Sequence, residues 1–170
     1  MKPHKGKFKK YLTKSKKEQV EIGCLIIKED GKEIELDKTC KGTYDTCPIG
    51  KVWDAFDQDR WDCIKGTFHT HIHRPEKFAG YGATSPRHKM SALDVEFDME
   101  LSDYSCLGYN NKVLCHDYRG LDKDTRLRYT EMAQKATKAL EGGSKVEYDW
   151  YMGEIESELK ARKAICRFTI

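Results

Sequence analysis

The sequence lacks any long hydrophobic run. No segment approaches the roughly 18 apolar residues that a membrane-spanning helix requires. The Lys-rich start, residues 1–17, also lacks the apolar stretch of a secretory signal. We therefore expect a soluble, cytoplasmic protein. Its 170 residues fit one domain, which can bury about two-thirds of its unfolded surface without disulfides.

Several signatures of cofactor binding and catalysis are also missing. The sequence contains no P-loop, no G-x-G-x-x-G fingerprint and no G-x-S-x-G nucleophile elbow, so nucleotide binding and serine-hydrolase chemistry have no support. None of the seven cysteines is spaced C-x-x-C, which gives a cysteine-based zinc site little support. Reduced thiols are the default in the cytosol, although a disulfide among Cys40, Cys47 and Cys63 stays open.

Charge is unevenly distributed along the chain. Eight lysines and no acidic residue fall in residues 1–17, so the rest of the chain carries −5 against a total of +3. This basic segment suits contact with nucleic acid or an acidic protein, but a solvated tail is the simpler interpretation. Within it, Phe8, Tyr11 and Leu12 have the spacing of a short helix with one apolar stripe.

Periodicity predicts a mixed α/β (α+β) fold, a β-sheet flanked by helices. Further helices are expected over 91–101, 124–140 and 149–164, with residues 38–62 irregular. Strands are expected over 20–27, 32–36, 64–69 and 165–170. Two shorter strands are expected near 107 and over 112–115, on either side of an Asn110-Asn111 turn. An Asp30-Gly31 turn should join the first two strands. The residues expected to face inward are Leu93, Phe97 and Leu101 in one helix and Leu127, Met132, Ala136 and Leu140 in the next.

Two histidines mark the end of the 64–69 strand. His69 and His71 are two residues apart, and on an extended chain such residues point to the same face. Their imidazoles can then reach one ion. A catalytic zinc site uses three protein ligands and a water, so a carboxylate would complete the set.

Two further groups could join this pair. Ser91 and Asp94 form an S-x-x-D pattern before an apolar run, which is a helix-capping signature; the serine can cap while the aspartate turns toward a metal. Glu21 begins a buried strand, where a carboxylate is costly unless it is paired or lies in a cleft. It is either a charge at a strand edge or a proton acceptor beside a metal.

The order Glu, His-x-His, Ser-x-x-Asp resembles the JAMM motif of the MPN (Mov34/PAD-1) zinc metalloprotease family, with its cytidine-deaminase-like fold. The likeness lies in residues 21–27, 66–71, 90–94 and 107–115. It implies a catalytic domain over about 8–120, with C-terminal helices and a strand (121–170) packed on the same domain. It also implies that His69, His71 and Asp94 bind Zn2+, that Ser91 hydrogen-bonds the substrate oxyanion, and that Glu21 polarises the attacking water.

One departure from the family pattern is an inserted loop at about 72–90. The family has seven residues between the second histidine and the serine, whereas 19 separate His71 from Ser91. Loop length costs little, about 0.6 kcal/mol for each doubling, and the insertion could form a lid. A rival register uses Ser85 and His88, so that His88 replaces Asp94 as third ligand; His73 could be a fourth ligand of a structural site.

The sequence thus predicts a zinc-dependent metallopeptidase that hydrolyses an amide or isopeptide bond of a protein or peptide, such as a ubiquitin-like modifier. Two alternatives remain open. One is a non-catalytic MPN-like scaffold. The other is a metal-dependent nucleic-acid or phosphoester hydrolase, which the acidic body of the chain disfavours.

Overall fold

The structure is a computed structural model that describes residues 5–28, 35–43, 47–54, 56, 58–72 and 89–170. The helices are α1 (Lys5–Glu18), α2 (Ile49–Asp54), α3 (Ala92–Leu101), α4 (Lys123–Glu141) and α5 (Lys145–Ala161), with a 3-10 turn η1 (Gln58–Cys63). The strands are β1 (Ile22–Ile27), β2 (Glu35–Lys41), β3 (Ile64–His71), β4 (Tyr104–Tyr109), β5 (Lys112–Asp117) and β6 (Ile165–Thr169).

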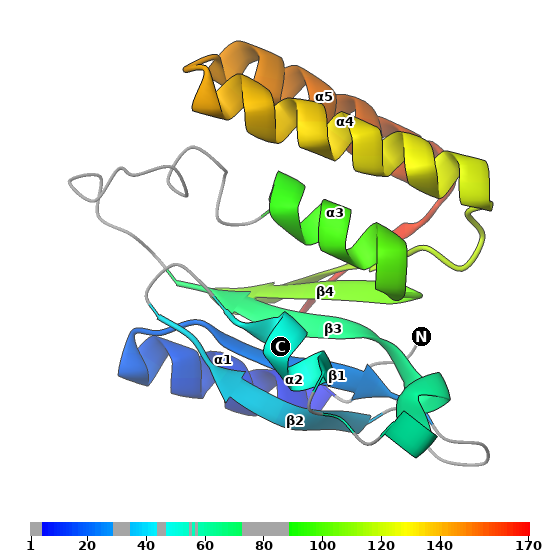
Figure 1. Ribbon diagram of the computed structural model, residues 1–170. Coiled ribbons are helices and arrows are strands. Elements are labelled where there is room, and N and C mark those ends of the chain that lie inside the picture. Colours follow the sequence, from blue (N-terminus) through cyan, green and yellow to red (C-terminus); the bar gives the residue numbers. More distant parts are fainter. Residues whose placement is uncertain (1–4, 29–34, 44–46, 55, 57, 73–88) are drawn as a thin grey trace.

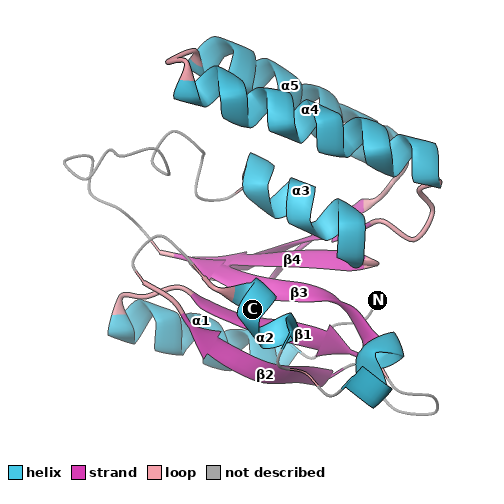
Figure 2. Cartoon of the chain, viewed as in Figure 1, coloured by secondary structure: helices cyan, strands magenta, loops and turns pink. Residues whose placement is uncertain are grey.

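The six strands form one mixed sheet in the order β2-β1-β3-β4-β5-β6. Only β3 and β4 among these neighbours are parallel, and α3 provides the crossover between them. The other neighbouring strands pair antiparallel. Helices cover both faces of the sheet (Figures 1 and 2), so the predicted mixed α/β class is confirmed.

Strand β3 presents different side chains to the two faces of the sheet. On one face, the Phe68 ring packs edge-to-face against Phe8 of α1, with 4.7 Å between the ring centroids. On the same face, the Thr70 hydroxyl donates to Ser15 Oγ of α1 at 2.7 Å. On the opposite face, the Thr67 hydroxyl donates to Asp98 Oδ1 of α3 at 3.0 Å. Because alternate residues share a face, His69 and His71 lie on the α3 side with Thr67.

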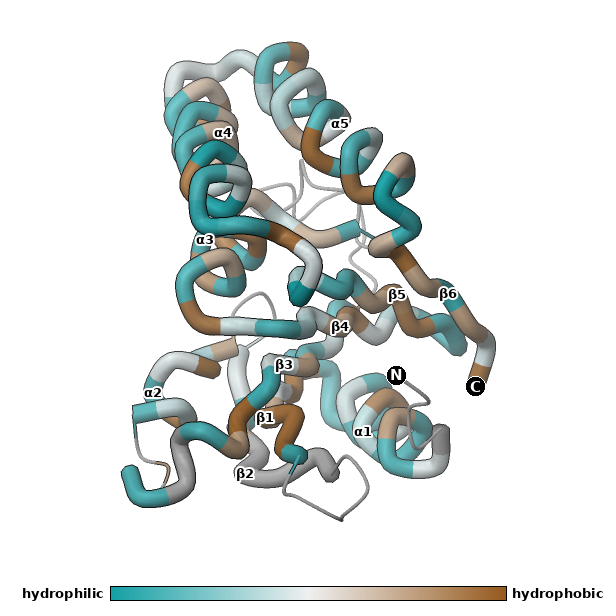
Figure 3. The backbone as a smooth tube through the Cα atoms, turned by 90° about the vertical axis from the view of Figure 1, so that its right-hand side faces the viewer, coloured by the Kyte–Doolittle hydropathy of each residue, from teal (hydrophilic) through white to brown (hydrophobic). Residues whose placement is uncertain are grey.

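The Lys-rich start is not a solvated tail. Its described part, residues 5–17, belongs to α1, which packs on the opposite face of the sheet from α2 and α3 (Figure 3). Phe8 and Leu12 are buried there among residues of the central strands, as the apolar stripe predicts. The described lysines from Lys9 to Lys17 occupy the outer face of the helix and are exposed. The tail interpretation is wrong because burial of the stripe anchors the segment despite its charge.

The inward stripe predicted for α3 is wrong at two of its three positions. Leu93 and Leu101 are exposed, whereas Phe97 is partly buried and packs against Trp53. The fully buried residues of this helix are Ala92, Val95, Asp98 and Met99. The reason is that α3 lies between the sheet and α4, so two of its sides are covered (Figure 1). In α4, Ala136 is buried as predicted, whereas Leu127 is exposed.

Residues 38–62 are more regular than expected, since β2, α2 and η1 occupy most of the segment. Trp53 and Phe56 pack there against β1 and β3. Helix α5 begins at Lys145, four residues before the predicted start, and the Asp30-Gly31 turn lies outside the described residues. No helix within the described ranges has the length and apolar character needed to cross a bilayer.

One cysteine pair departs from the expectation of reduced thiols. Cys106 and Cys115 are directly opposite each other in the β4–β5 register, with 4.1 Å between their Cα atoms, and form a disulfide. Cys40, Cys47 and Cys63 are free thiols.

Candidate metal centre

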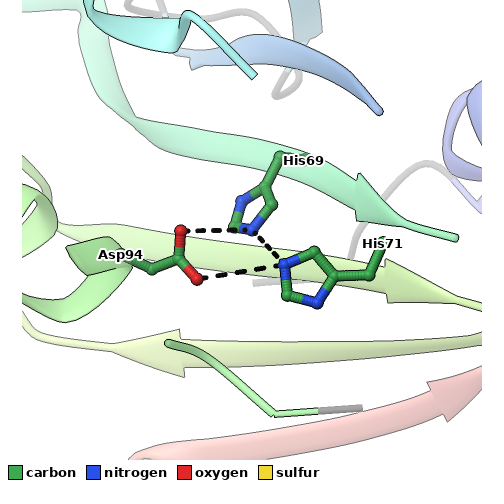
Figure 4. A group of neighbouring side chains, drawn as sticks. All are labelled: His69, His71 and Asp94. Carbon is green, nitrogen blue, oxygen red and sulfur yellow. Dashed lines mark hydrogen bonds and ion pairs between the residues drawn. The ribbon is translucent and has the colours of Figure 1, made fainter. Parts of the chain in front are cut away.

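Three side chains converge on the α3 face of the sheet (Figure 4). His69 Nε2 lies 3.1 Å from His71 Nε2 and 3.4 Å from Asp94 Oδ1. His71 Nε2 lies 4.0 Å from Asp94 Oδ2. Within the part of the chain that the structure describes, these residues form the one group of three or more His, Cys, Asp or Glu side chains close enough to share a metal ion.

The β3–α3–β4 crossover brings the ligands together. The two histidines end β3, and Asp94 lies in the first turn of α3, which begins above that end of the strand. The start of α3 is fixed from the other side by Tyr148 of α5, whose hydroxyl accepts from the Ala92 amide at 3.2 Å. The ligands thus lie on two regular elements, β3 and α3, and α5 contacts the start of α3.

The spacing of these atoms fits a tetrahedral zinc ion. Zinc binds imidazole nitrogen at about 2.0–2.1 Å and carboxylate oxygen at about 2.0–2.2 Å, so ligand atoms of a tetrahedral site lie about 3.3–3.5 Å apart. The separations of 3.1 and 3.4 Å at His69 are close to that value. The 4.0 Å separation of His71 and Asp94 is about 0.6 Å wider than that value.

Asp94 and His69 form a partly buried ion pair. Burial alone would lower the pKa of His69, but the Asp94 carboxylate outweighs burial and raises it to about 9. Burial would likewise raise the pKa of Asp94, but the His69 imidazole holds it well below its usual range. A metal ion would bind the neutral imidazole, so its binding at neutral pH would release a proton from His69.

Ser91 both caps α3 and contacts the Asp94 carboxylate. Its hydroxyl accepts from the Asp94 amide at 3.2 Å, while the Ser91 amide donates to Asp94 Oδ2 at 2.8 Å. This reciprocal pair is a capping box. The same hydroxyl donates to Asp94 Oδ2 at 2.8 Å, so the cap also fixes the carboxylate that faces the histidines.

Glu21 immediately precedes β1 and is buried. Its amide donates to Thr43 O, and its carbonyl accepts from the Gly42 amide, both at 2.8 Å. Gly23 is the register partner of His69, so alternation puts Glu21 on the same sheet face as the histidines. Its negative charge is near enough to help raise the pKa of His69.

The sequence reasoning missed Asp98, one turn after Asp94. Its carboxylate is buried, and Oδ1 accepts from the hydroxyls of Thr67 and Ser102, both at 3.0 Å. Burial raises its pKa to about 6. The signal available in the sequence was its spacing of four from Asp94, which places both carboxylates on one helix face.

Three other histidines were candidates or lie near the sheet. His73 and His88, the alternative ligands, lie outside the described residues. His116 is buried on β5 with Nδ1 3.0 Å from the Tyr118 hydroxyl. Burial lowers its pKa to about 4, and it is not a member of the three-residue group.

No protein-family model, curated protein or solved structure matches this chain. Any assignment of function therefore depends on the arrangement of these side chains.

Proposed function

We propose that this protein is a zinc-dependent metallopeptidase of the JAMM type, which hydrolyses an amide or isopeptide bond in a protein or peptide. The observation that carries the proposal is the convergence of His69, His71 and Asp94, whose ligand atoms all lie within 4.8 Å of one another. Two imidazoles and one carboxylate form the three-ligand set that leaves a fourth position for water in catalytic zinc sites.

The exposure of the three ligands indicates where a substrate would approach. The side chains of His69 and His71 are 8% and 7% exposed, whereas that of Asp94 is 23% exposed. Solvent therefore reaches the group from the side of Asp94 and the start of α3. Ser91, which belongs to that side, is suitably placed to contact a substrate carbonyl group.

Bound zinc would supply a Lewis acid that makes water acidic near neutral pH. Glu21 would accept the proton of the attacking water and return it to the leaving amine. Ser91 would donate a hydrogen bond from its hydroxyl group to the substrate oxyanion, a contact typically worth about 10²- to 10³-fold in rate. That hydrogen bond requires the hydroxyl to turn from Asp94 Oδ2, to which it donates in the structure.

The phosphoester alternative is less well supported. The exposed lysines of α1 lie on the opposite face of the sheet from the metal centre (Figure 3). They are therefore poorly placed to guide a phosphate backbone to that centre, although such guidance is how a basic patch assists nucleic-acid binding.

Metal analysis tests the site first. We expect one zinc per chain in the wild type, none after His69→Ala with His71→Ala, and one in the control His116→Gln, which alters a buried histidine outside the group. Zinc retained by the double variant would reject the site.

Turnover tests the chemistry. We expect chelator-sensitive cleavage of a ubiquitin-like fusion or of an isopeptide-linked lysine, and Glu21→Gln should keep the zinc but lose turnover. Full activity in Glu21→Gln would show that Glu21 is not the base. A chain that binds one zinc yet cleaves neither substrate would instead indicate the non-catalytic scaffold.

A further inference from the structure

Two free thiols lie beside the metal centre and have no part in the proposed chemistry. Cys40 Sγ and Cys47 Sγ are 3.0 Å apart, and both residues are partly exposed. They pack against the backbone of Gly23: a Cβ on Gly23 would overlap Cys47 Sγ and lie 3.1 Å from Cys40 Sγ. A larger residue at position 23 would therefore displace the thiols.

The sheet register ties this pair to the site. Gly23 is the partner of Cys40 on one side and of His69 on the other. Cys40, Gly23 and His69 thus form a row across β2, β1 and β3, with adjacent strands about 4.8 Å apart. Because the central member of the row is glycine, no side chain on β1 separates the thiols from the imidazole.

The segment between the two cysteines also holds Glu21. Gly42 and Thr43 make the two backbone hydrogen bonds to Glu21, each 2.8 Å long, and both residues fall inside the 40–47 interval. We call these two hydrogen bonds the backbone clamp. A covalent link between Cys40 and Cys47 would close a ring that contains Gly42 and Thr43. Such a ring removes conformational freedom from the enclosed segment.

We propose that Cys40 and Cys47 are a redox-active pair that a hydroperoxide converts into a disulfide, locking the backbone clamp on Glu21. The pair needs only a short movement, because a disulfide has an S–S distance of about 2.05 Å and the thiols start 3.0 Å apart. The consequence for catalysis rests on the proposed function, since only there is Glu21 the base; the disulfide itself does not.

The chemistry balances with hydrogen peroxide as the oxidant. The Cys40 thiolate attacks one peroxide oxygen, the O–O bond breaks, and water leaves after protonation while Cys40 becomes a sulfenic acid. Cys47 Sγ then attacks Cys40 Sγ and expels the hydroxyl group as a second water. The two thiols lose two electrons, which reduce the peroxide. The thiols share a hydrogen bond that lowers the pKa of Cys40, so Cys40 is the attacking group.

Peptide mapping tests whether the disulfide forms. After peroxide treatment and alkylation under denaturing, non-reducing conditions, trypsin should release fragments 39–41 and 42–51 as one linked species. The matched control Cys63→Ser, which alters another partly exposed free thiol, should give the same species, and Cys40→Ser should not. Cys40 recovered as an unlinked sulfinic acid in the wild type would overturn the proposal.

Hydrogen exchange tests the clamp without reference to metal or activity. The Glu21 and Gly42 amides donate the two clamp bonds, so their exchange should slow by about tenfold on oxidation, whereas amides of α4 should not change. Linkage without slower exchange at these two amides would refute the lock. If the disulfide forms and slows exchange in a chain that neither binds zinc nor cleaves peptides, the proposed function fails and the proposal for the thiol pair stands. If the chain binds zinc and cleaves peptides but the disulfide does not form, only the proposal for the thiol pair is rejected.

Discussion

Asp98 provides the sharpest test of the electrostatics beneath the metal centre. The substitution is Asp98→Asn, which removes a buried negative charge but keeps the Oδ1 atom that accepts from Thr67 and Ser102. A pKa of about 6 in the folded chain against 3.8 in the unfolded chain means that the folded state binds this proton more tightly. Ionised Asp98 therefore destabilises the fold, fully above pH 6 and not at all well below pH 4.

The size of the effect follows from the two pKa values. Their difference is worth about 3 kcal/mol, at 1.36 kcal/mol per pKa unit. The amide group that replaces the carboxylate needs hydrogen-bond acceptors in a buried site, which costs about 1 kcal/mol or more. We therefore expect Asp98→Asn to stabilise the metal-free chain by about 2 kcal/mol at pH 7.5, and to be neutral or destabilising at pH 4.

Urea denaturation in the presence of a chelator measures this difference from pH 4 to pH 8. The difference between Asp98→Asn and the wild type isolates Asp98 from the other titrating groups. Glu100→Gln is the matched control, because Glu100 is an exposed carboxylate on the same helix, and its effect should stay within about 0.5 kcal/mol. An Asp98→Asn effect that is the same at pH 4 and pH 7.5 would refute the reasoning.

Three other substitutions test the fold and the site. Ser91→Ala removes the side-chain cap of α3 and should cost about 1 kcal/mol in urea denaturation, while zinc stays at one per chain because the Ser91 amide still donates to Asp94 Oδ2; loss of the metal would contradict the sufficiency of that amide contact. Gly66→Ala would drive a Cβ into the carbonyl oxygen of Tyr104 on β4, so we expect loss of cooperative thermal unfolding; a wild-type melting curve would show that the strands can separate. Phe8→Ala should cost about 3–5 kcal/mol, whereas exposed Leu93→Ala should cost under about 0.5 kcal/mol; equal costs would mean that α1 is not part of the core.

Local patterns in the sequence predict much of this structure. Alternation predicts β3 and the shared face of His69 and His71, and the S-x-x-D signature predicts the start of α3. The convergence of Asp94 with the histidines was proposed from the residue types and from the family resemblance, but no local pattern predicts it, because it depends on the crossover from β3 to β4. Such contacts between distant segments leave no local periodicity.

Other features were missed for identifiable physical reasons. The Cys106–Cys115 disulfide follows from hairpin register, since both residues are equally distant from the predicted Asn110-Asn111 turn, yet neither cysteine carries a local signal of its own. Asp98 was missed because a carboxylate on a helix is usually solvated. The lysines of residues 1–17 dominated the interpretation of that segment, although Phe8 and Leu12 already indicated a packed helix.

The two-sided character of β3 bears on which changes in chain length this protein can accept. Inserting or deleting one residue between Ile64 and Phe68 would rotate the rest of the strand by one position. The imidazoles would then lie on the α1 side of the sheet, away from Asp94, and Phe68 would lie on the α3 side. Evolution can therefore lengthen or shorten the chain between His71 and Ser91 at small entropic cost, whereas the number of residues that lead into His69 is fixed.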